Sequence, residues 1–211
     1  MNYYISDLHL GSQRICELCN RPFKTVEEMN AIIIDNINNT CSAEDTLYIL
    51  WDVGGGTTYM VPMLRHLQPK LILIIGNHDV HQLQYRTFRD CFERIENSMV
   101  VKDGSYKIFL NHYPVAEWNG YWQNVYHLYG HVHNADKGPA ILMKCIPHCA
   151  NVSADVTGFK PMTADELFKD KQNAIYALTL AGTIQFNSSD LYISADERNG
   201  KKMLKINGEE V

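Results

Sequence analysis

Residues 71–79 of the chain read Leu-Ile-Leu-Ile-Ile-Gly-Asn-His-Asp. Five consecutive aliphatic residues that end at a glycine are typical of a strand buried on both faces, as in the sheets of α/β proteins. Ligands bind outside the carboxyl ends of such strands. The amide, imidazole and carboxylate of Asn77, His78 and Asp79 are therefore predicted to lie at a functional edge of a sheet. Considered alone, they fit equally well a polar turn in which Asp79 caps a helix.

Other apolar runs in the chain also end in side chains that bind metals. They are 3–5 before Asp7 and His9, 46–50 before Asp52, 106–110 before Asn111 and His112, and 125–129 before His131 and His133. Strands that all present Asp, Asn or His at their carboxyl ends gather one polar cluster at one edge of a sheet. Histidine and carboxylate together suit Mn, Fe or Zn better than Ca or Mg. The ligands are too many for one ion, which predicts two.

The order and spacing of these motifs resemble the calcineurin-like metallophosphoesterases. The matching motifs are Asp7-x-His9, Asp52, Gly76-Asn77-His78-Asp79, His112 and Gly130-His131-x-His133. Segments 20–23, 27–29, 45–48, 112–114, 117–118 and 151–161 also resemble a small, single-domain bacterial or phage-type branch of the family. The likeness covers residues 1–168. It implies an α/β (α+β) fold, a four-layer αββα sandwich of two mixed sheets flanked by helices.

The family pattern also implies a role for each residue. The implied metal ligands are Asp7, His9 and His133 for one ion, Asn77, His112 and His131 for the second, and Asp52 as the bridge. His78 would act on the leaving-group oxygen, and Asp79 would orient it. The cofactors would be two divalent transition-metal ions, Mn²⁺ in preference to Fe or Zn, and a hydroxide bridging them would be the nucleophile.

Trp51 departs from this pattern, because the family has glycine immediately before the bridging aspartate. An indole there would narrow the mouth of the pocket, pack beneath the sheet or distort Asp52, while the glycines at 54–56 give the loop room to adjust. Two functions therefore stay open. The first is a dinuclear metal-dependent hydrolase of phosphate esters, of diesters more than monoesters. The alternative is a non-catalytic metal-binding or protein-interaction module of the same fold, with its activity impaired by Trp51.

The bulk composition describes an ordinary globular protein. A chain of 211 residues, 45% of them hydrophobic, fits a single domain spanning 1–211 that buries roughly 70% of its unfolded surface. A net charge of -5 is not the basic excess that is typical of proteins that bind nucleic acids or membrane surfaces, so neither partner is expected. The first predicted strand follows Met1 without room for a signal peptide, so a cytoplasmic location and six reduced cysteines are expected. The expected partner is a phosphate-ester small molecule or a nucleotide-like substrate.

Alternation of apolar and polar residues predicts the order of elements. Expected strands are 2–6, 46–51, 70–75, 100–101, 106–110, 124–129, 140–146 and 151–156, and expected helices are 26–38, 57–67, 81–94 and 163–168, with a loop at 10–23. Thr25 should cap the first helix, whose expected buried stripe is Met29, Ile32, Ile33, Asn36 and Ile37. Residues 169–211 are predicted to be an appendage with a hairpin at 191–206 around Asn199-Gly200, which offers a surface for homo-oligomerisation.

Several further residues allow more than one interpretation. Arg14 and Arg21 either contact a substrate phosphate or are solvated, with solvation favoured. The aromatic residues of 118–122 either stack on a flat leaving group or cover the core. Asn151 and Asp155 are expected to support the loop of His131 and His133. Among the other histidines, His127 is expected to be structural and His66 solvated. A second zinc site built from Cys16, Cys19, Cys145, Cys149 and His148 is the disfavoured alternative to reduced thiols.

Overall fold

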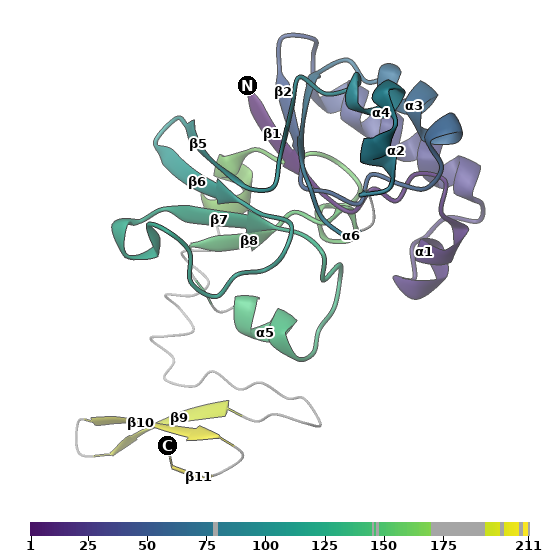
Figure 1. Cartoon of the computed structure of the whole chain (residues 1–211). Helices are drawn as coiled ribbons and strands as arrows, with labels where there is room; N and C mark the ends of the chain where they lie inside the picture. The colour runs from purple at the N-terminus through teal and green to yellow at the C-terminus, as the bar shows by residue number, and fades with distance from the viewer. Residues whose placement is uncertain are drawn as a thin grey trace.

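The computed structural model describes residues 1–77, 80–144, 146, 148–169, 193–198, 201–206 and 209–210. Two four-stranded sheets form its body (Figure 1). The first sheet has the order β1 (Asn2–Ile5), β2 (Thr46–Ile49), β3 (Lys70–Ile74), β4 (Arg94–Glu96), and all its strand pairs are parallel. The second has the order β5 (Met99–Asp103), β6 (Tyr106–Leu110), β7 (Tyr126–Tyr129), β8 (Cys149–Asn151), with β5 and β6 antiparallel and the other pairs parallel. The predicted α/β sandwich is confirmed.

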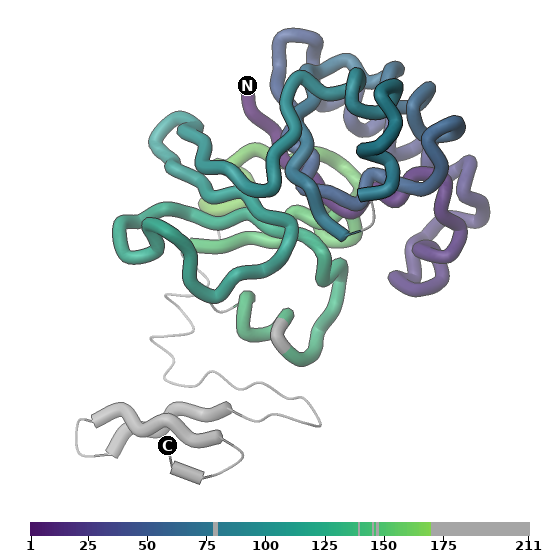
Figure 2. The backbone as a smooth tube through the Cα atoms, viewed as in Figure 1, coloured from purple at the N-terminus to yellow at the C-terminus, as the bar shows by residue number. Residues whose placement is uncertain are grey.

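Helices and short turns connect and cover the sheets. They are α1 (Gln13–Leu18), α2 (Val26–Thr40), α3 (Thr57–Arg65), η1 (Gln82–Gln84), α4 (Arg86–Arg89), η2 (Tyr121–Gln123), α5 (Pro139–Lys144) and α6 (Ala154–Thr157). Residues 164–169 are also helical. Figure 2 shows the half that carries α2–α4, in purple to blue, beside the half that carries the second sheet, in teal to green. None of the described helices has both the length and the apolar character needed to cross a membrane.

The central strand β3 is buried on both faces, as its run of aliphatic residues predicts. Leu71 and Leu73 face the core shared with the helices α1–α4, whereas Ile74 and the partly buried Ile72 face the core between the two sheets. A third core lies on the other face of the second sheet, around Trp118. These three cores take up most of the faces of both sheets, and the candidate site lies at the carboxyl ends of the strands.

The first long helix, α2, begins where its capping box predicts. The Thr25 hydroxyl accepts a hydrogen bond from the Glu28 backbone N–H at 3.2 Å, and the Glu28 carboxylate accepts one from Lys24 N–H at 2.7 Å. Its buried residues are Met29, Asn30, Ile33 and Ile37. The predicted stripe was wrong at Ile32, which is 37% exposed, and at Asn36, which is only partly buried. It also omitted Asn30, whose side chain accepts the Gly11 N–H at 3.0 Å.

Several predicted elements differ from the observed ones. The loop at 10–23 contains α1, and the helix at 81–94 is divided into η1 and α4 and ends in the edge strand β4. The strand at 140–146 is wrong, because α5 occupies 139–144 and buries Ala140 and Met143 one helical turn apart. A short apolar run does not distinguish a strand from a buried helix. The strand at 151–156 ends at Asn151, and α6 follows it.

The predicted hairpin is present in the described part of the tail. Strands β9 (Ile193–Arg198) and β10 (Lys201–Ile206) pair antiparallel with Arg198 opposite Lys201, and β11 (Glu209–Glu210) adds to β10. The Asn199-Gly200 turn itself lies outside the described residues. The division into a core and an appendage stays a prediction.

Candidate metal centre

The candidate site lies where five strands end, β1, β2, β3, β6 and β7, and where the chain turns sharply. Six residues at these ends have positive φ although none is glycine: Asp7 (56°), His9 (51°), Trp51 (73°), Asp52 (49°), His131 (68°) and His133 (48°). A left-handed conformation costs a side-chain-bearing residue about 1–2 kcal/mol. Such strain persists only where the surroundings hold it, and it concentrates at functional sites.

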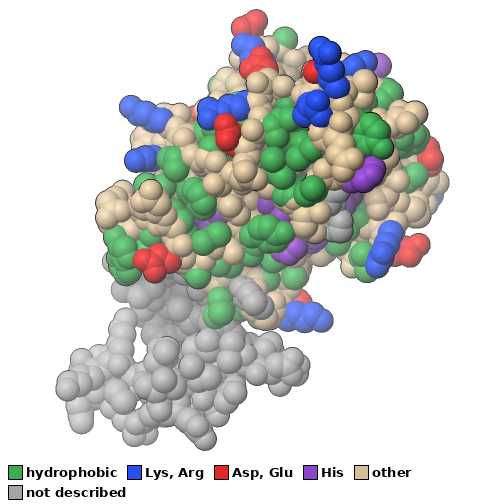
Figure 3. Space-filling model, in the orientation of Figure 1, with side chains coloured by type: hydrophobic (Ala, Val, Ile, Leu, Met, Phe, Trp, Pro, Cys, Tyr) green, Lys and Arg blue, Asp and Glu red, His purple; other side chains and the backbone are tan. Residues whose placement is uncertain are grey.

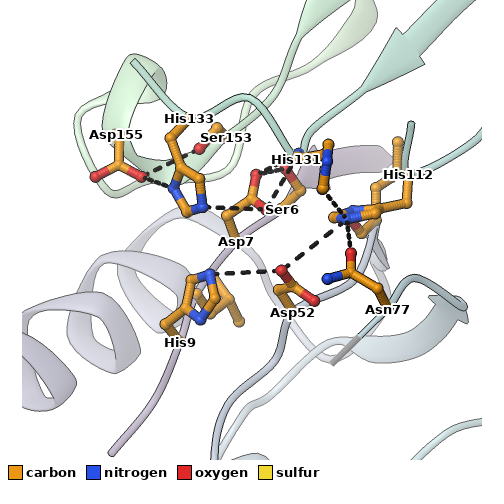
Figure 4. Close-up of polar contacts among 12 residues, drawn as sticks. Ser6, Asp7, His9, Asp52, Asn77, His112, His131, His133, Ser153 and Asp155 are labelled. Carbon is orange, nitrogen blue, oxygen red and sulfur yellow. Dashed lines mark hydrogen bonds and ion pairs between the residues drawn. The ribbon is translucent and has the colours of Figure 1, made fainter. Parts of the chain in front are cut away.

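One side of the site, the Asp7 group, consists of Asp7, His9 and His133 (Figure 4). The Asp7 carboxylate is fully buried and accepts hydrogen bonds from the Ser6 hydroxyl at 2.6 Å and from the His131 backbone N–H at 3.1 and 3.2 Å. His133 Nε2 lies 3.9 Å from Asp7 Oδ1, and the rings of His9 and His133 stack with centroids 5.1 Å apart. Donor atoms of these three residues lie close enough together to hold a metal ion.

The other side, the His112 group, consists of Asn77, His112 and His131. The buried His112 ring donates from Nδ1 to the Leu50 carbonyl oxygen, 3.1 Å away. Burial lowers the pKa of His112 to about 4, so the ring is neutral near pH 7 and its Nε2 carries a lone pair. This nitrogen lies 3.2 Å from Asn77 Oδ1 and 3.2 Å from His131 Nδ1. Lone pairs of nitrogen and oxygen therefore converge at one point, as they do around a cation.

Asp52 lies between the two groups. Its Oδ2 is 3.5 Å from His9 Nε2 and 3.9 Å from His112 Nε2. Asp52, Asp7 and His112, all buried, form a second set of donors that can hold a metal ion. Buried carboxylates beside a neutral imidazole fit a divalent transition metal, because the ion supplies the positive charge that buried carboxylates require.

The structure thus brings together every residue predicted as a metal ligand, and their role as ligands stays a prediction. His78 and Asp79 lie outside the described residues. The site is partly open, because the side chains of His9 and His133 are 14% and 18% exposed. On the face shown in Figure 3, histidine side chains reach the surface next to hydrophobic ones.

A buried ion pair braces the Asp7 group from behind. Arg21 Nε and Nη2 donate to the two Asp155 carboxylate oxygens at 2.8 and 2.9 Å, and Asp155 accepts from His133 Nδ1 at 2.7 Å. Arg21 also donates to the carbonyl oxygens of Asp7 and Leu8 at 2.7 and 3.0 Å. Both interpretations of Arg21 were wrong, since it is neither solvated nor free to meet a substrate. Its partners were not recognisable because Asp155 lies 134 residues away.

This network shifts the pKa of Asp155 and the pKa of His133. Burial alone would raise the pKa of Asp155, but the hydrogen bonds from His133 and Arg21 outweigh it and lower that pKa to about 2. Burial works to lower the pKa of His133, whereas the hydrogen bond to Asp155 and the charge of Asp7 act more strongly and raise it. The ionised Asp155 fixes the proton of His133 on Nδ1 and turns Nε2 toward Asp7.

Asn151 and two serines complete the brace. Asn151 donates from Nδ2 to the His133 carbonyl oxygen at 2.8 Å, and its Oδ1 accepts the Ser153 N–H at 2.9 Å. The Ser153 hydroxyl donates to Asp155 at 3.2 Å. The predicted support of the His131 and His133 loop by Asn151 and Asp155 is confirmed at His133. Ser6 and Ser153 were missed, because a serine beside an acidic residue is common and carries no distinguishing signal.

Trp51 is buried against residues of the site. Its side chain is buried, 4% exposed, with its ring centroid 5.2 Å from that of His112. Of the three predicted positions for the indole, a place at the pocket mouth is wrong, because the ring is buried against His112 and Gly76 at the strand ends. The backbone at Trp51 and Asp52 is hydrogen-bonded to the segment that follows β1. The Asp7 N–H donates to Trp51 O at 2.9 Å, and the His9 N–H donates to Asp52 O at 2.8 Å.

Trp118 and His127 are structural residues. Trp118 is a core residue, 6% exposed, whose Nε1 donates to Val125 O at 2.8 Å. His127 is structural, as expected: it is fully buried and bonded to Phe109 O and Val115 N–H. His66 and Arg14 are exposed, as expected.

The described cysteines do not form a shared site. Cys16 and Cys19 lie in the core beside the helices, whereas Cys149 lies in the core on the far face of the second sheet. These three are thiols rather than disulfide partners of one another, and Cys145 lies outside the described residues. The alternative of a zinc site joining these three cysteines is wrong.

Comparison with known proteins finds no matching protein-family model. The chain is 30% identical over 171 residues to the uncharacterized protein MJ1445 of Methanocaldococcus jannaschii, covering 79% of this chain and 89% of that protein. The structure of AQ665 from Aquifex aeolicus, a protein of unknown function, matches with a TM-score of 0.63 at 24% identity over 79% of this chain and 96% of its own, which supports the fold alone. A novel archaeal phosphodiesterase matches 97% of this chain and 98% of its own with a TM-score of 0.42 at 12% identity, too low a likeness to support an inference.

Proposed function

Since the chain belongs to the family of the uncharacterized protein MJ1445, we propose a function from its site: a metal-dependent hydrolase of phosphate esters, within the calcineurin-like metallophosphoesterases. The observation that carries the proposal is the convergence of lone pairs at His112. A buried imidazole, held at Nδ1 by Leu50 O, points its Nε2 at the Asn77 amide oxygen, 3.2 Å away, and a cation between these two atoms would satisfy both lone pairs.

The position of each residue suggests its role in metal binding or proton transfer. The Asp7 group would hold one ion, the His112 group a second, and Asp52 would bind both. Divalent ions bound there, Mn²⁺ in preference to Fe or Zn, would lower the pKa of water and offset the charge that develops on phosphoryl oxygens. Asp155 keeps His133 in the tautomer that presents Nε2, and Leu50 does the same for His112. His78, oriented by Asp79, would give a proton to the leaving-group oxygen.

The proposed substrate is a phosphodiester with a flat group, such as a nucleotide-like ester. Tyr113 supports this choice, because it is 44% exposed and its ring lies edge-on to His131, with centroids 4.7 Å apart. An exposed aromatic ring beside a metal site can stack on a base or an aryl leaving group. A cytoplasmic location and self-association through residues 169–211 stay predictions.

The test is hydrolysis of bis(p-nitrophenyl) phosphate and of p-nitrophenyl phosphate by metal-stripped protein as Mn²⁺ is added back. We expect saturable, metal-dependent turnover that is faster with the diester. Asp52→Asn should lower kcat at least about 10³-fold, since it removes the charged ligand between the two groups. His66→Gln, which removes an exposed histidine far from the chemistry, should leave the rate unchanged. Metal binding without turnover would instead support the non-catalytic module.

A further inference from the structure

Trp51 combines three features that packing alone does not favour. Its φ of 73° lies in the left-handed region, which side-chain-bearing residues avoid. Its indole is buried. Its Nε1, also buried, has no hydrogen-bond partner within the described part of the chain. Buried donors in folded proteins are nearly always paired, and strained residues cluster at functional sites. The position therefore requires an explanation from what the indole touches.

The indole occupies the space beside Gly76. A Cβ atom added at Gly76 would lie 1.8 Å from Trp51 Cδ2 and 2.0 Å from Cε3, so the ring takes the volume of any side chain at that position. Gly76 directly precedes Asn77, one of the proposed ligands. The ring thus rests against the backbone that presents the Asn77 amide.

The same indole contacts the ring of His112. The two ring centroids are 5.2 Å apart, and the planes are inclined by 40°. The hydrogen bond from His112 Nδ1 to Leu50 O fixes one nitrogen of the imidazole. The ring could still rotate about that nitrogen, and such a rotation would change the direction of Nε2. Contact with the indole restricts this rotation. Leu50 and Trp51 are neighbours in the chain, so one segment supplies both constraints.

We propose that Trp51 is a positioning residue: it holds His112 and the turn at Gly76-Asn77 in the arrangement that binds a divalent ion. The proposal rests on the proposed function, because it concerns ion binding by the His112 group. Glycine at position 51 would relieve the backbone but would leave open the space beneath His112. Trp51→Gly is therefore expected to weaken the site, although the family pattern has glycine there.

The first experiment measures the contact without metal. Urea unfolding midpoints are compared for wild type, Gly76→Ala, Trp51→Gly and the double variant. We expect Gly76→Ala to lower the urea midpoint strongly when Trp51 is present. In the Trp51→Gly background the decrease should be at least threefold smaller, because the added methyl group then has room. If Gly76→Ala does not fold alone, folding of the double variant reports the same rescue. An equal loss in both backgrounds would overturn the proposed contact.

The second experiment measures ion binding. Mn²⁺ titrations followed by calorimetry compare Trp51→Gly, Trp51→Phe and the control Trp118→Phe, which alters a tryptophan in the core on the far face of the second sheet. We expect Trp51→Gly to lower the affinity for at least one ion tenfold or more, and both phenylalanine variants to stay within threefold of wild type. If Trp51 only stabilised the fold, folded Trp51→Gly and folded Trp51→Phe would bind Mn²⁺ with equal affinity.

A fluorescence measurement supplies an independent readout. Emission of Trp51, obtained as the difference between wild type and Trp51→Phe, should be quenched as Co²⁺ or Mn²⁺ binds, because the indole contacts a ligand ring. Normal binding by Trp51→Gly would overturn the role of Trp51 and leave the proposed function standing. Wild-type protein that binds neither ion would overturn the proposed function, while the unfolding comparison would still decide the contact with Gly76.

Discussion

The two sides of the candidate centre are held by different forces. Behind the Asp7 group lies a buried network of charges, in which Arg21 pairs with Asp155 and Asp155 bonds His133 at 2.7 Å. Behind the His112 group lie a backbone carbonyl and the face of an indole. A charged brace fails abruptly, because removing one partner leaves the other buried and uncompensated. An apolar brace weakens gradually with the volume removed.

This contrast predicts that the largest loss of stability follows from breaking the ion pair. Arg21→Met should destabilise the metal-free protein by about 3–5 kcal/mol, since Asp155 would remain buried without its main partner. Urea unfolding measures this loss, and Arg14→Met, which removes an exposed arginine of α1, should change it by less than about 0.5 kcal/mol. A similar small change for both variants would show that the charged brace contributes no more than a surface arginine.

A second substitution tests how tightly the Asp7 group is packed. A Cβ atom at Gly130 would lie 2.1 Å from Ser6 Oγ and 2.6 Å from Asp7 Oδ2. Gly130→Ala should therefore displace the Asp7 carboxylate, cost about 3 kcal/mol and weaken ion binding. Gly55→Ala is the matched control, because nothing lies within 4 Å of its added Cβ. Unchanged unfolding and Mn²⁺ binding in Gly130→Ala would contradict the close packing.

The smallest expected effect depends on pH. The pKa of Asp155 is lowered from 3.8 to about 2 in the folded protein, so its contribution to stability is complete above pH 4 and is lost as pH falls toward 2. The stability difference between wild type and Asp155→Asn should shrink by about 2 kcal/mol between pH 5 and pH 2. Unfolding midpoints across this range measure the change. A difference independent of pH would mean that Asp155 does not titrate with a lowered pKa.

Sequence patterns anticipated the site better than they anticipated its supports. The ligands were found because they follow apolar runs, and the ends of neighbouring parallel strands meet at one edge. Arg21 follows no such rule, since its partner is 134 residues away and only the folded chain brings the two together. The helix α5 was mistaken for a strand because its short apolar run, residues 140–143, is compatible with either structure. The place of the Trp51 indole depended on the space left at Gly76, which no local pattern encodes.

The left-handed residues at the strand ends also bear on selection. Glycine adopts positive φ at lower cost than the aspartates, histidines and tryptophan found there. A library of variants screened only for thermostability should therefore accumulate replacements at these positions and lose the ligand set early. At these positions the chain therefore combines a strained backbone with side chains placed to bind, which is the usual signature of a functional site.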